Sequence, residues 1–117
     1  SSAASDVYKR QAYKAHFQVE KEVPQVAIDK AMWYIFKLVN SVGEFKAGTR
    51  KKYYYDRLMR TIGTVERRMK VDCSLLRDAV EAYMKRRSKA NKTALNDATK
   101  YVCIKVLESA LQKFKKA

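Results

Sequence analysis

The fold follows from one stretch of the sequence, residues 50–70, which reads RKKYYYDRLMRTIGTVERRMK. Its apolar side chains recur at the spacing i, i+3, i+4 and i+7, which places them on one side of an α-helix. They are Tyr55, Leu58, Met59, Ile62, Val65 and Met69. This pattern predicts an amphipathic helix that buries one face.

The opposite side of this predicted helix is basic. Since a helix has about 3.6 residues per turn, one arc opposite the apolar stripe holds several cations and no Asp or Glu. This arginine arc consists of Arg50, Tyr53, Arg57, Arg60, Thr64, Arg67 and Arg68. Like charges at i, i+3 and i+4 repel by a few tenths of a kcal/mol per pair. A helix that needed only a solvated surface would gain from interspersed Glu, so we expect a ligand outside the chain to compensate this charge.

The same apolar periodicity predicts three more helices. The first begins at Pro24, which the first turn tolerates, and ends at Gly43, which leaves residues 44–49 as a connection. The third is capped by Asp72 or Ser74 and runs to about Ala90.

Residues 91–93 are predicted to form the last turn of the chain. From Leu95 to Phe114 a broader apolar arc indicates a helix that touches two neighbours rather than one. No window alternates as a strand does, so the sequence predicts an all-α fold. Four main helices of about 17–23 residues with short connections favour a compact bundle of antiparallel neighbours.

The N-terminal residues fall outside this pattern. Residues 1–11 resemble a translated transposase-end sequencing adapter, a scar seen on open reading frames from metagenome assemblies, and are left out of the fold prediction. Residues 12–22 are predicted to form a short, weakly held segment. Residues 12–117 then make a single helical domain.

Composition agrees with a folded, basic protein. The 117 residues are 47% hydrophobic and carry 26 Lys and Arg against 12 Asp and Glu, a net charge of +14. No apolar run approaches the roughly 20 residues of a membrane span. Cys73 and Cys103 form no C-x-x-C pattern, which favours two reduced thiols in a cytoplasmic protein, with a single disulfide as the alternative.

A second basic cluster lies near the predicted end of the third helix. It consists of Lys85, Arg86, Arg87, Lys89 and Lys92. Cations there can complement the carbonyl dipole of a helix C-terminus, or they can bind phosphate. The sequence leaves both interpretations open.

Two aromatic residues and one glycine are also candidates. Trp33 projects from the helix face opposite Ile28 and Ile35, so it is expected to contact a partner, the N-terminal segment or a base. Tyr53 lies among cations and could stack on an unpaired base. Gly63 interrupts a strong helix pattern, which suits either close helix packing or contact with a nucleic-acid backbone.

No pattern of a catalytic, metal or cofactor site is found. His16 is the one histidine and has no nearby Cys or paired carboxylate, and the sequence contains no Gly-rich phosphate loop and no nucleophile elbow. We therefore predict a non-enzymatic protein without a metal or a cofactor.

Two segments resemble the small all-helical subunit of type III CRISPR effector complexes. Residues 105–115, KVLESALQKFK, are similar to that family's C-terminal run. Residues 28–34, IDKAMWY, resemble its Ile-Arg-Lys-aromatic helix start, with Asp29 in place of Arg. The resemblance implies a structural subunit of an antiviral ribonucleoprotein whose Arg and Lys hold a guide–target duplex.

These observations predict a nucleic-acid-binding accessory subunit that grips phosphates through the arginine arc and the second basic cluster, with RNA favoured over DNA. Other protein subunits or further copies of the chain are expected as partners. The alternatives are an assembly module that meets an acidic partner or an anionic membrane through Trp33, and a phage or plasmid factor that handles DNA.

Overall fold

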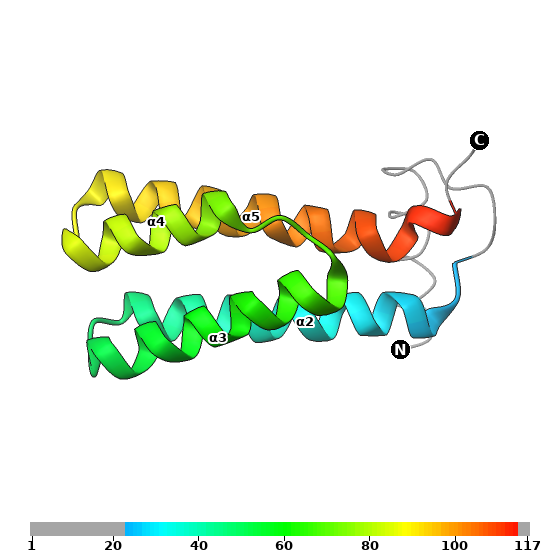
Figure 1. Ribbon diagram of the computed structural model, residues 1–117, viewed down its shortest axis with the longest axis horizontal. Helices are drawn as coiled ribbons and strands as arrows, with labels where there is room; N and C mark the ends of the chain where they lie inside the picture. The colour runs from blue at the N-terminus through cyan, green and yellow to red at the C-terminus, as the bar shows by residue number, and fades with distance from the viewer. Residues whose placement is uncertain (1–22, 115–117) are drawn as a thin grey trace, which may run out of the picture.

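Two helical hairpins form the bundle in the computed structural model, which describes residues 23–114 (Figure 1). The helices are α2 (Gln25–Lys46), α3 (Lys51–Met69), α4 (Ser74–Lys85) and α5 (Lys89–Leu111), followed by the short 3-10 helix η1 (Gln112–Phe114). The predicted all-α bundle of four main helices is confirmed. The predictions for residues 1–11, residues 12–22 and His16 lie outside the described residues.

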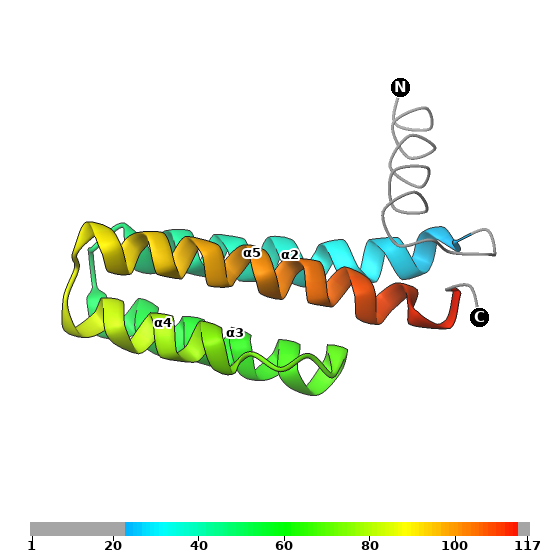
Figure 2. The same cartoon turned by 90° about the horizontal axis from the view of Figure 1, so that it is seen from above.

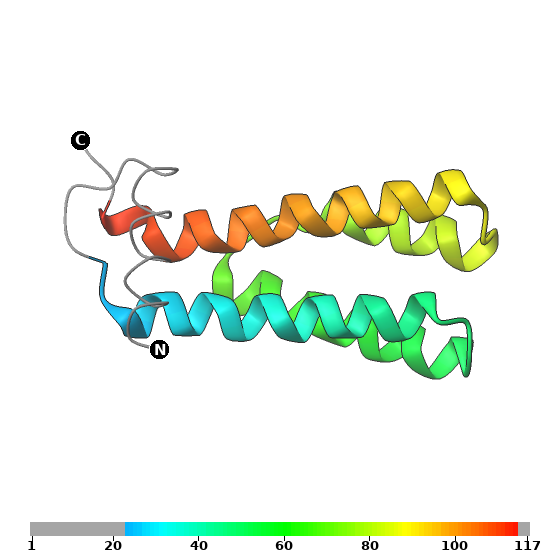
Figure 3. The ribbon, with the colours of Figure 1, turned by 180° about the vertical axis from the view of Figure 1, so that it is seen from behind.

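The four helices stand at the corners of a square. α2 packs against α3 and α5, and α4 packs closely against α5 and more loosely against α3. Figure 2 shows α2 and α5 in one layer with α3 and α4 in the other, and Figure 3 shows α5 running alongside α2. The predicted contact of the last helix with two neighbours is therefore confirmed.

The interior is filled by apolar side chains from all four helices. From α3 come Leu58, Ile62, Val65 and Met69, all buried as the stripe predicts, while Tyr55 and Met59 are half-buried at its margin. Complete burial of a Leu, Ile or Val side chain contributes about 1.5–3 kcal/mol. A smaller cluster closes the end of the bundle with Val23, Ile28, Leu111 and Phe114.

The first predicted helix boundary is wrong, because α2 does not end at Gly43. It continues to Lys46, and Gly43 is exposed with open space where a Cβ would lie. An interior glycine costs a helix about 1 kcal/mol, which the buried Phe45 beyond it offsets. The turn instead uses Gly48, whose φ of 86° suits a residue without a side chain.

The third predicted helix is also too long. α4 has 12 residues and ends at Lys85, so the predicted helix to Ala90 and the turn at residues 91–93 are corrected. Ser88 starts α5 instead, since its side chain accepts a hydrogen bond from the Asn91 backbone N–H at 3.1 Å. The Asn91 amide also donates to carbonyls at the end of α4, which secures the short turn.

Local polar contacts set the start of α4 and its contact with α3. The Asp72 carboxylate accepts hydrogen bonds from the Ser74 backbone N–H and hydroxyl, and these bonds lower the pKa of Asp72. The N-cap residue is Cys73, without a side-chain cap, so neither predicted residue occupies the cap position, although Asp72 accepts the Ser74 backbone N–H from one residue earlier. Both cysteines are free thiols. At Gly63 a Cβ would lie 3.2 Å from an Arg67 nitrogen and 3.8 Å from an Arg77 nitrogen, so this glycine makes room for guanidinium groups between α3 and α4.

Candidate nucleic-acid interface

The arginine arc is at the surface, as the periodicity of α3 requires. Every arginine of the arc is exposed, Tyr53 is 43% exposed and Thr64 is half-buried. The arc spans α3 from its N-cap residue, Arg50, to its last turn. α3 therefore presents one long cationic side to solvent.

A hollow between α2 and α3 brings part of this arc together with α2. It has a volume of about 360 Å³ and is lined by Lys37, Arg57, Arg60, Thr61 and Thr64. Its lining combines three cations with two hydroxyl-bearing side chains and contains no carboxylate. Beneath it, the Thr61 and Ser41 hydroxyls hydrogen-bond to each other at 3.2 Å and join the two helices. We call this hollow the α2/α3 groove.

Lys37 is the groove cation that sequence reasoning missed. The arginine arc was defined from the period of one helix, and Lys37 lies on another helix whose own charge is nearly balanced. The only signal was its place beside Trp33 on the polar side of α2. A cation on a neighbouring helix joins a basic face only once the packing of α2 against α3 is known.

Carboxylates reach the arginine arc at one point in the described part of the chain. A carboxylate oxygen of Glu44 on α2 lies 3.4 Å from Arg57, and both side chains are partly exposed. Among residues 23–114, Arg60, Arg67 and Arg68 form no ion pair. Most of the positive charge of the arc therefore remains unneutralised within these residues.

The basic surface continues toward the start of α2. A second hollow of about 490 Å³ includes Lys30, Arg68 and Lys70 in its lining, together with small and apolar side chains from α2 and α5. From Arg57 to Arg68 the rise along α3 is about 16 Å. The cations thus follow the α2 and α3 pair rather than gathering at one spot.

The second basic cluster lies at the opposite end of the bundle, the end that carries both hairpin turns (Figure 1). Lys85, Arg86, Lys89 and Lys92 are exposed there. Arg50 stands at the same end, in the α2–α3 turn, with a left-handed backbone (φ 45°). The fold therefore places this cluster near the first residue of the arginine arc.

Arg87 differs from the other members of the cluster because its side chain turns inward. Its guanidinium group donates hydrogen bonds to the Phe45 carbonyl at 3.0 Å and the Lys46 carbonyl at 3.4 Å. It also stacks on the Phe45 and Tyr83 rings, with its carbon 5.2 and 4.8 Å from their centroids. Arg87 thus satisfies carbonyls at the C-terminus of α2 and links the two hairpins.

The two predicted aromatic candidates have different surroundings. Trp33 is 56% exposed, with the Lys37 ammonium 4.8 Å from its ring centroid. Tyr53 is 43% exposed, with the Arg50 guanidinium 4.1 Å from its ring centroid and a T-shaped contact with Tyr54. Trp33 is therefore the more open ring.

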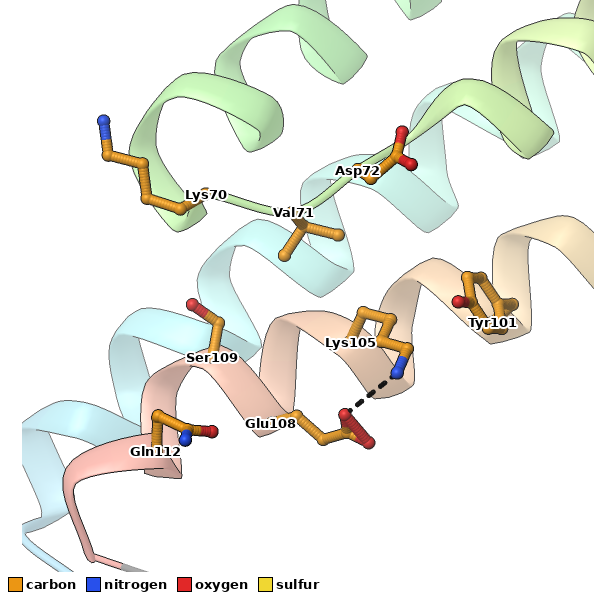
Figure 4. A pocket seen from close by; sticks show the side chains of 8 residues that line it. All are labelled: Lys70, Val71, Asp72, Tyr101, Lys105, Glu108, Ser109 and Gln112. Atoms are coloured by element: carbon orange, nitrogen blue, oxygen red, sulfur yellow. Dashed lines mark hydrogen bonds and ion pairs between the residues drawn. The ribbon is translucent and has the colours of Figure 1, made fainter.

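A further hollow of about 360 Å³ lies between the α3–α4 connection and α5 (Figure 4). Its charged side chains are of both signs, and Lys105 forms an ion pair with Glu108 at 3.2 Å, which raises the pKa of Lys105. Asp72 adds another negative charge to its lining. Mixed charge fits a polyanion less well than the α2/α3 groove does.

Two groups that could have chemical roles, Glu66 and Cys73, are held by structural contacts. Arg77 binds Glu66 through two nitrogens, which lowers the pKa of Glu66, and burial raises the pKa of Cys73 to about 11. Across residues 23–114 no three His, Cys, Asp or Glu side chains gather as metal ligands would. None of the helices in this range has the length and apolar character needed to cross a bilayer.

No protein-family model matches the chain, and no curated protein or solved structure matches it. The resemblance to the CRISPR small subunit stays a prediction. The function must therefore be argued from the surface itself.

Proposed function

We propose that this protein is a non-enzymatic nucleic-acid-binding subunit that holds the phosphate backbone, preferentially of RNA, along α2 and α3. The observation that carries the proposal is the lining of the α2/α3 groove, in which Lys37, Arg57 and Arg60 come together without a carboxylate. The hollow at Lys30, Arg68 and Lys70 extends the same sign of charge along the pair of helices.

The residue types that line the groove are well suited to binding the phosphates of a nucleic acid. A guanidinium fork binds two phosphate oxygens at once, whereas an ammonium acts as a point charge. The Thr61 and Thr64 hydroxyls lie in the same lining. Phosphates of one strand of a duplex are spaced about 3.4 Å along its axis, so about 16 Å of α3 can face several of them.

The arrangement of the helices argues against base readout of DNA by a recognition helix. A sequence-specific DNA-binding protein of the helix-turn-helix type inserts a recognition helix into the major groove. In Figures 1 and 2, the described helices run along one common long axis, and none of them projects from the bundle. A groove between parallel rods fits a backbone better than it fits base edges.

The test is a titration with RNA at several salt concentrations, using a variant that combines Lys37→Gln, Arg57→Gln and Arg60→Gln. If about six phosphates are bound, affinity of the wild type falls about a hundred- to a thousandfold between 50 and 200 mM salt. The triple variant loses binding and this salt dependence while its helical circular dichroism is unchanged. Lys100→Gln, an exposed cation on α5, serves as the control and leaves binding nearly intact.

Flat salt dependence, or equal binding by the triple variant, would contradict the proposal. A matched DNA oligonucleotide in the same titration tests the alternative of a DNA-handling factor, which predicts tighter binding of DNA than of RNA.

A second candidate function is an assembly module, and one observation favours it. An apolar hollow of about 500 Å³ between α4 and α5 is lined by Leu75, Ala79, Ala94, Ala98 and Tyr101, with Asp78 and Asp97. Size-exclusion chromatography with and without nuclease separates the two candidates. A particle that shrinks after nuclease supports nucleic-acid binding, whereas a nuclease-resistant oligomer free of nucleic acid supports assembly.

A further inference from the structure

Trp33 is the largest aromatic side chain that the bundle leaves in solvent. It is 56% exposed on α2, and the edge-to-face contact with Tyr34 has a centroid distance of 4.8 Å. The indole ring thus has one aromatic neighbour but is not part of either buried cluster. An anchored, exposed ring is suited to a stacking contact.

Lys37 connects this ring to the α2/α3 groove. Its ammonium lies 4.8 Å from the Trp33 centroid, and the same side chain lines the hollow that contains Arg57 and Arg60. The ring therefore borders the cations that the proposed function assigns to phosphate. A nucleotide matches this pairing of a ring with cations, because it joins a flat base to a negatively charged phosphate.

We infer that the α2/α3 groove takes single-stranded nucleic acid and that Trp33 stacks on one of its unpaired bases. In a duplex each base is already stacked between its neighbours, so a protein ring gains access to a base face mainly in single strands, loops and ends. Cationic grooves with aromatic platforms are the usual solution for binding single strands. This inference rests on the proposed function and adds the class of ligand.

The surroundings of Trp33 and Tyr53 decide between the two rings. Each ring makes a T-shaped contact with the tyrosine that follows it, but Tyr53 is 43% exposed against 56% for Trp33 and has the Arg50 guanidinium at 4.1 Å from its ring centroid. On Trp33 the covering group is the end of a flexible lysine chain, 4.8 Å away, which can move from the ring to a phosphate. A base can take its place on the indole face.

The experiment uses the fact that the chain has one tryptophan. Its fluorescence is followed while the full chain is titrated with single-stranded oligouridylate, with an abasic strand of equal length and with a blunt RNA duplex. Oligouridylate is expected to quench the fluorescence and to bind more tightly than the other two probes. The abasic strand retains salt-dependent binding but does not quench.

Variants then separate stacking from charge. Trp33→Ala lowers the affinity for oligouridylate by roughly 5- to 150-fold, as expected for one lost base–aromatic stack, and Trp33→Phe restores most of it. Phe36→Ala is the matched control, because Phe36 is 58% exposed on the same helix and does not line the groove. It leaves the affinity unchanged.

Three results would overturn the inference while leaving the proposed function in place. They are equal affinity for the abasic strand and oligouridylate, duplex binding at least as tight as single-strand binding, and full affinity of Trp33→Ala. A wild-type chain that binds none of the three probes would overturn both.

Discussion

A carboxylate oxygen of Glu44 on α2 lies 3.4 Å from a guanidinium nitrogen of Arg57 on α3, at the edge of the α2/α3 groove. The pair connects the two helices in the same place where phosphate is proposed to bind. Because both side chains are partly exposed, the ion pair adds little to the stability of the fold. If phosphate binds Arg57 as proposed, the Glu44 carboxylate competes with it.

Glu44→Gln is therefore expected to raise the affinity for RNA by about 1.4- to 5-fold, which corresponds to the 0.2–1 kcal/mol of an exposed ion pair. The unfolding temperature should change little. RNA titrations at low and high salt measure the effect, with Asp97→Asn as a control that removes an exposed carboxylate between α4 and α5. An equal gain in the control would mean that net charge alone, rather than release of Arg57, is responsible.

Arg86 and Arg87 are adjacent in sequence but should behave oppositely when replaced by Ala. Arg87→Ala removes two hydrogen bonds to α2 carbonyls and the contacts with two rings, so it should lower the free energy of unfolding by about 2–3 kcal/mol. Arg86→Ala alters an exposed side chain and should change stability by less than about 0.5 kcal/mol. Denaturant unfolding of both variants decides the comparison.

The same two variants should also differ in RNA binding. Arg86→Ala is expected to weaken it, while Arg87→Ala keeps it at temperatures where the chain is folded. Equal loss of RNA affinity in both would place Arg87 in the interface.

The Glu66–Arg77 ion pair should make stability depend on pH. Arg77 lowers the pKa of Glu66 below its ordinary 4.5, so the carboxylate stabilises the fold above that pH, and this stabilisation is lost as the pH falls through the lower pKa of the folded state. Glu66→Gln removes this contribution. Between pH 5 and pH 3, unfolding free energies should therefore fall less steeply for the variant than for the wild type.

Parallel curves over this range would show that the pair does not contribute. Asp72→Asn is a useful comparison, because Asp72 also has a lowered pKa, but its partner is Ser74 rather than a cation.

Ser88 should be important for the short turn before α5. Ser88→Ala removes the acceptor for the Asn91 backbone N–H and is expected to cost about 0.5–2 kcal/mol of unfolding free energy. Thr93→Ala is the control, since Thr93 is an exposed residue of α5 that lies beyond the cap. A loss no larger than the control's would place the helix start elsewhere.

The sequence predicted the fold where burial alone determines it. The stripe that includes Leu58, Ile62 and Val65 identified α3, because an apolar stripe that continues over five helical turns is typical of a helix packed on a hydrophobic core. The prediction from the sequence was wrong where a few polar contacts decide the position of a helix boundary. Nothing in its periodicity showed that Ser88 and Asn91 would end α4 and start α5, since α5 continues the apolar pattern with little interruption.

The candidate site was predictable for residues on a single helix and not for contacts between helices. Periodicity placed Arg57 and Arg60 on the exposed face of α3, where the structure shows them. Lys37, Glu44 and the inward turn of Arg87 depend on which helices are neighbours. Periodicity reports which side of a helix is apolar, but it does not report what stands beside it.

Val23 and Phe114, near the two ends of the described chain, pack in one cluster with Ile28 and Leu111. Since α5 also lies against α2, the last helix is a neighbour of the first, and the four helices form a closed ring of contacts. The packing of the helices consequently does not depend on which helix comes first in the chain. A circularly permuted chain, joined where these ends meet and opened at Gly48, would keep every helix beside its present neighbours.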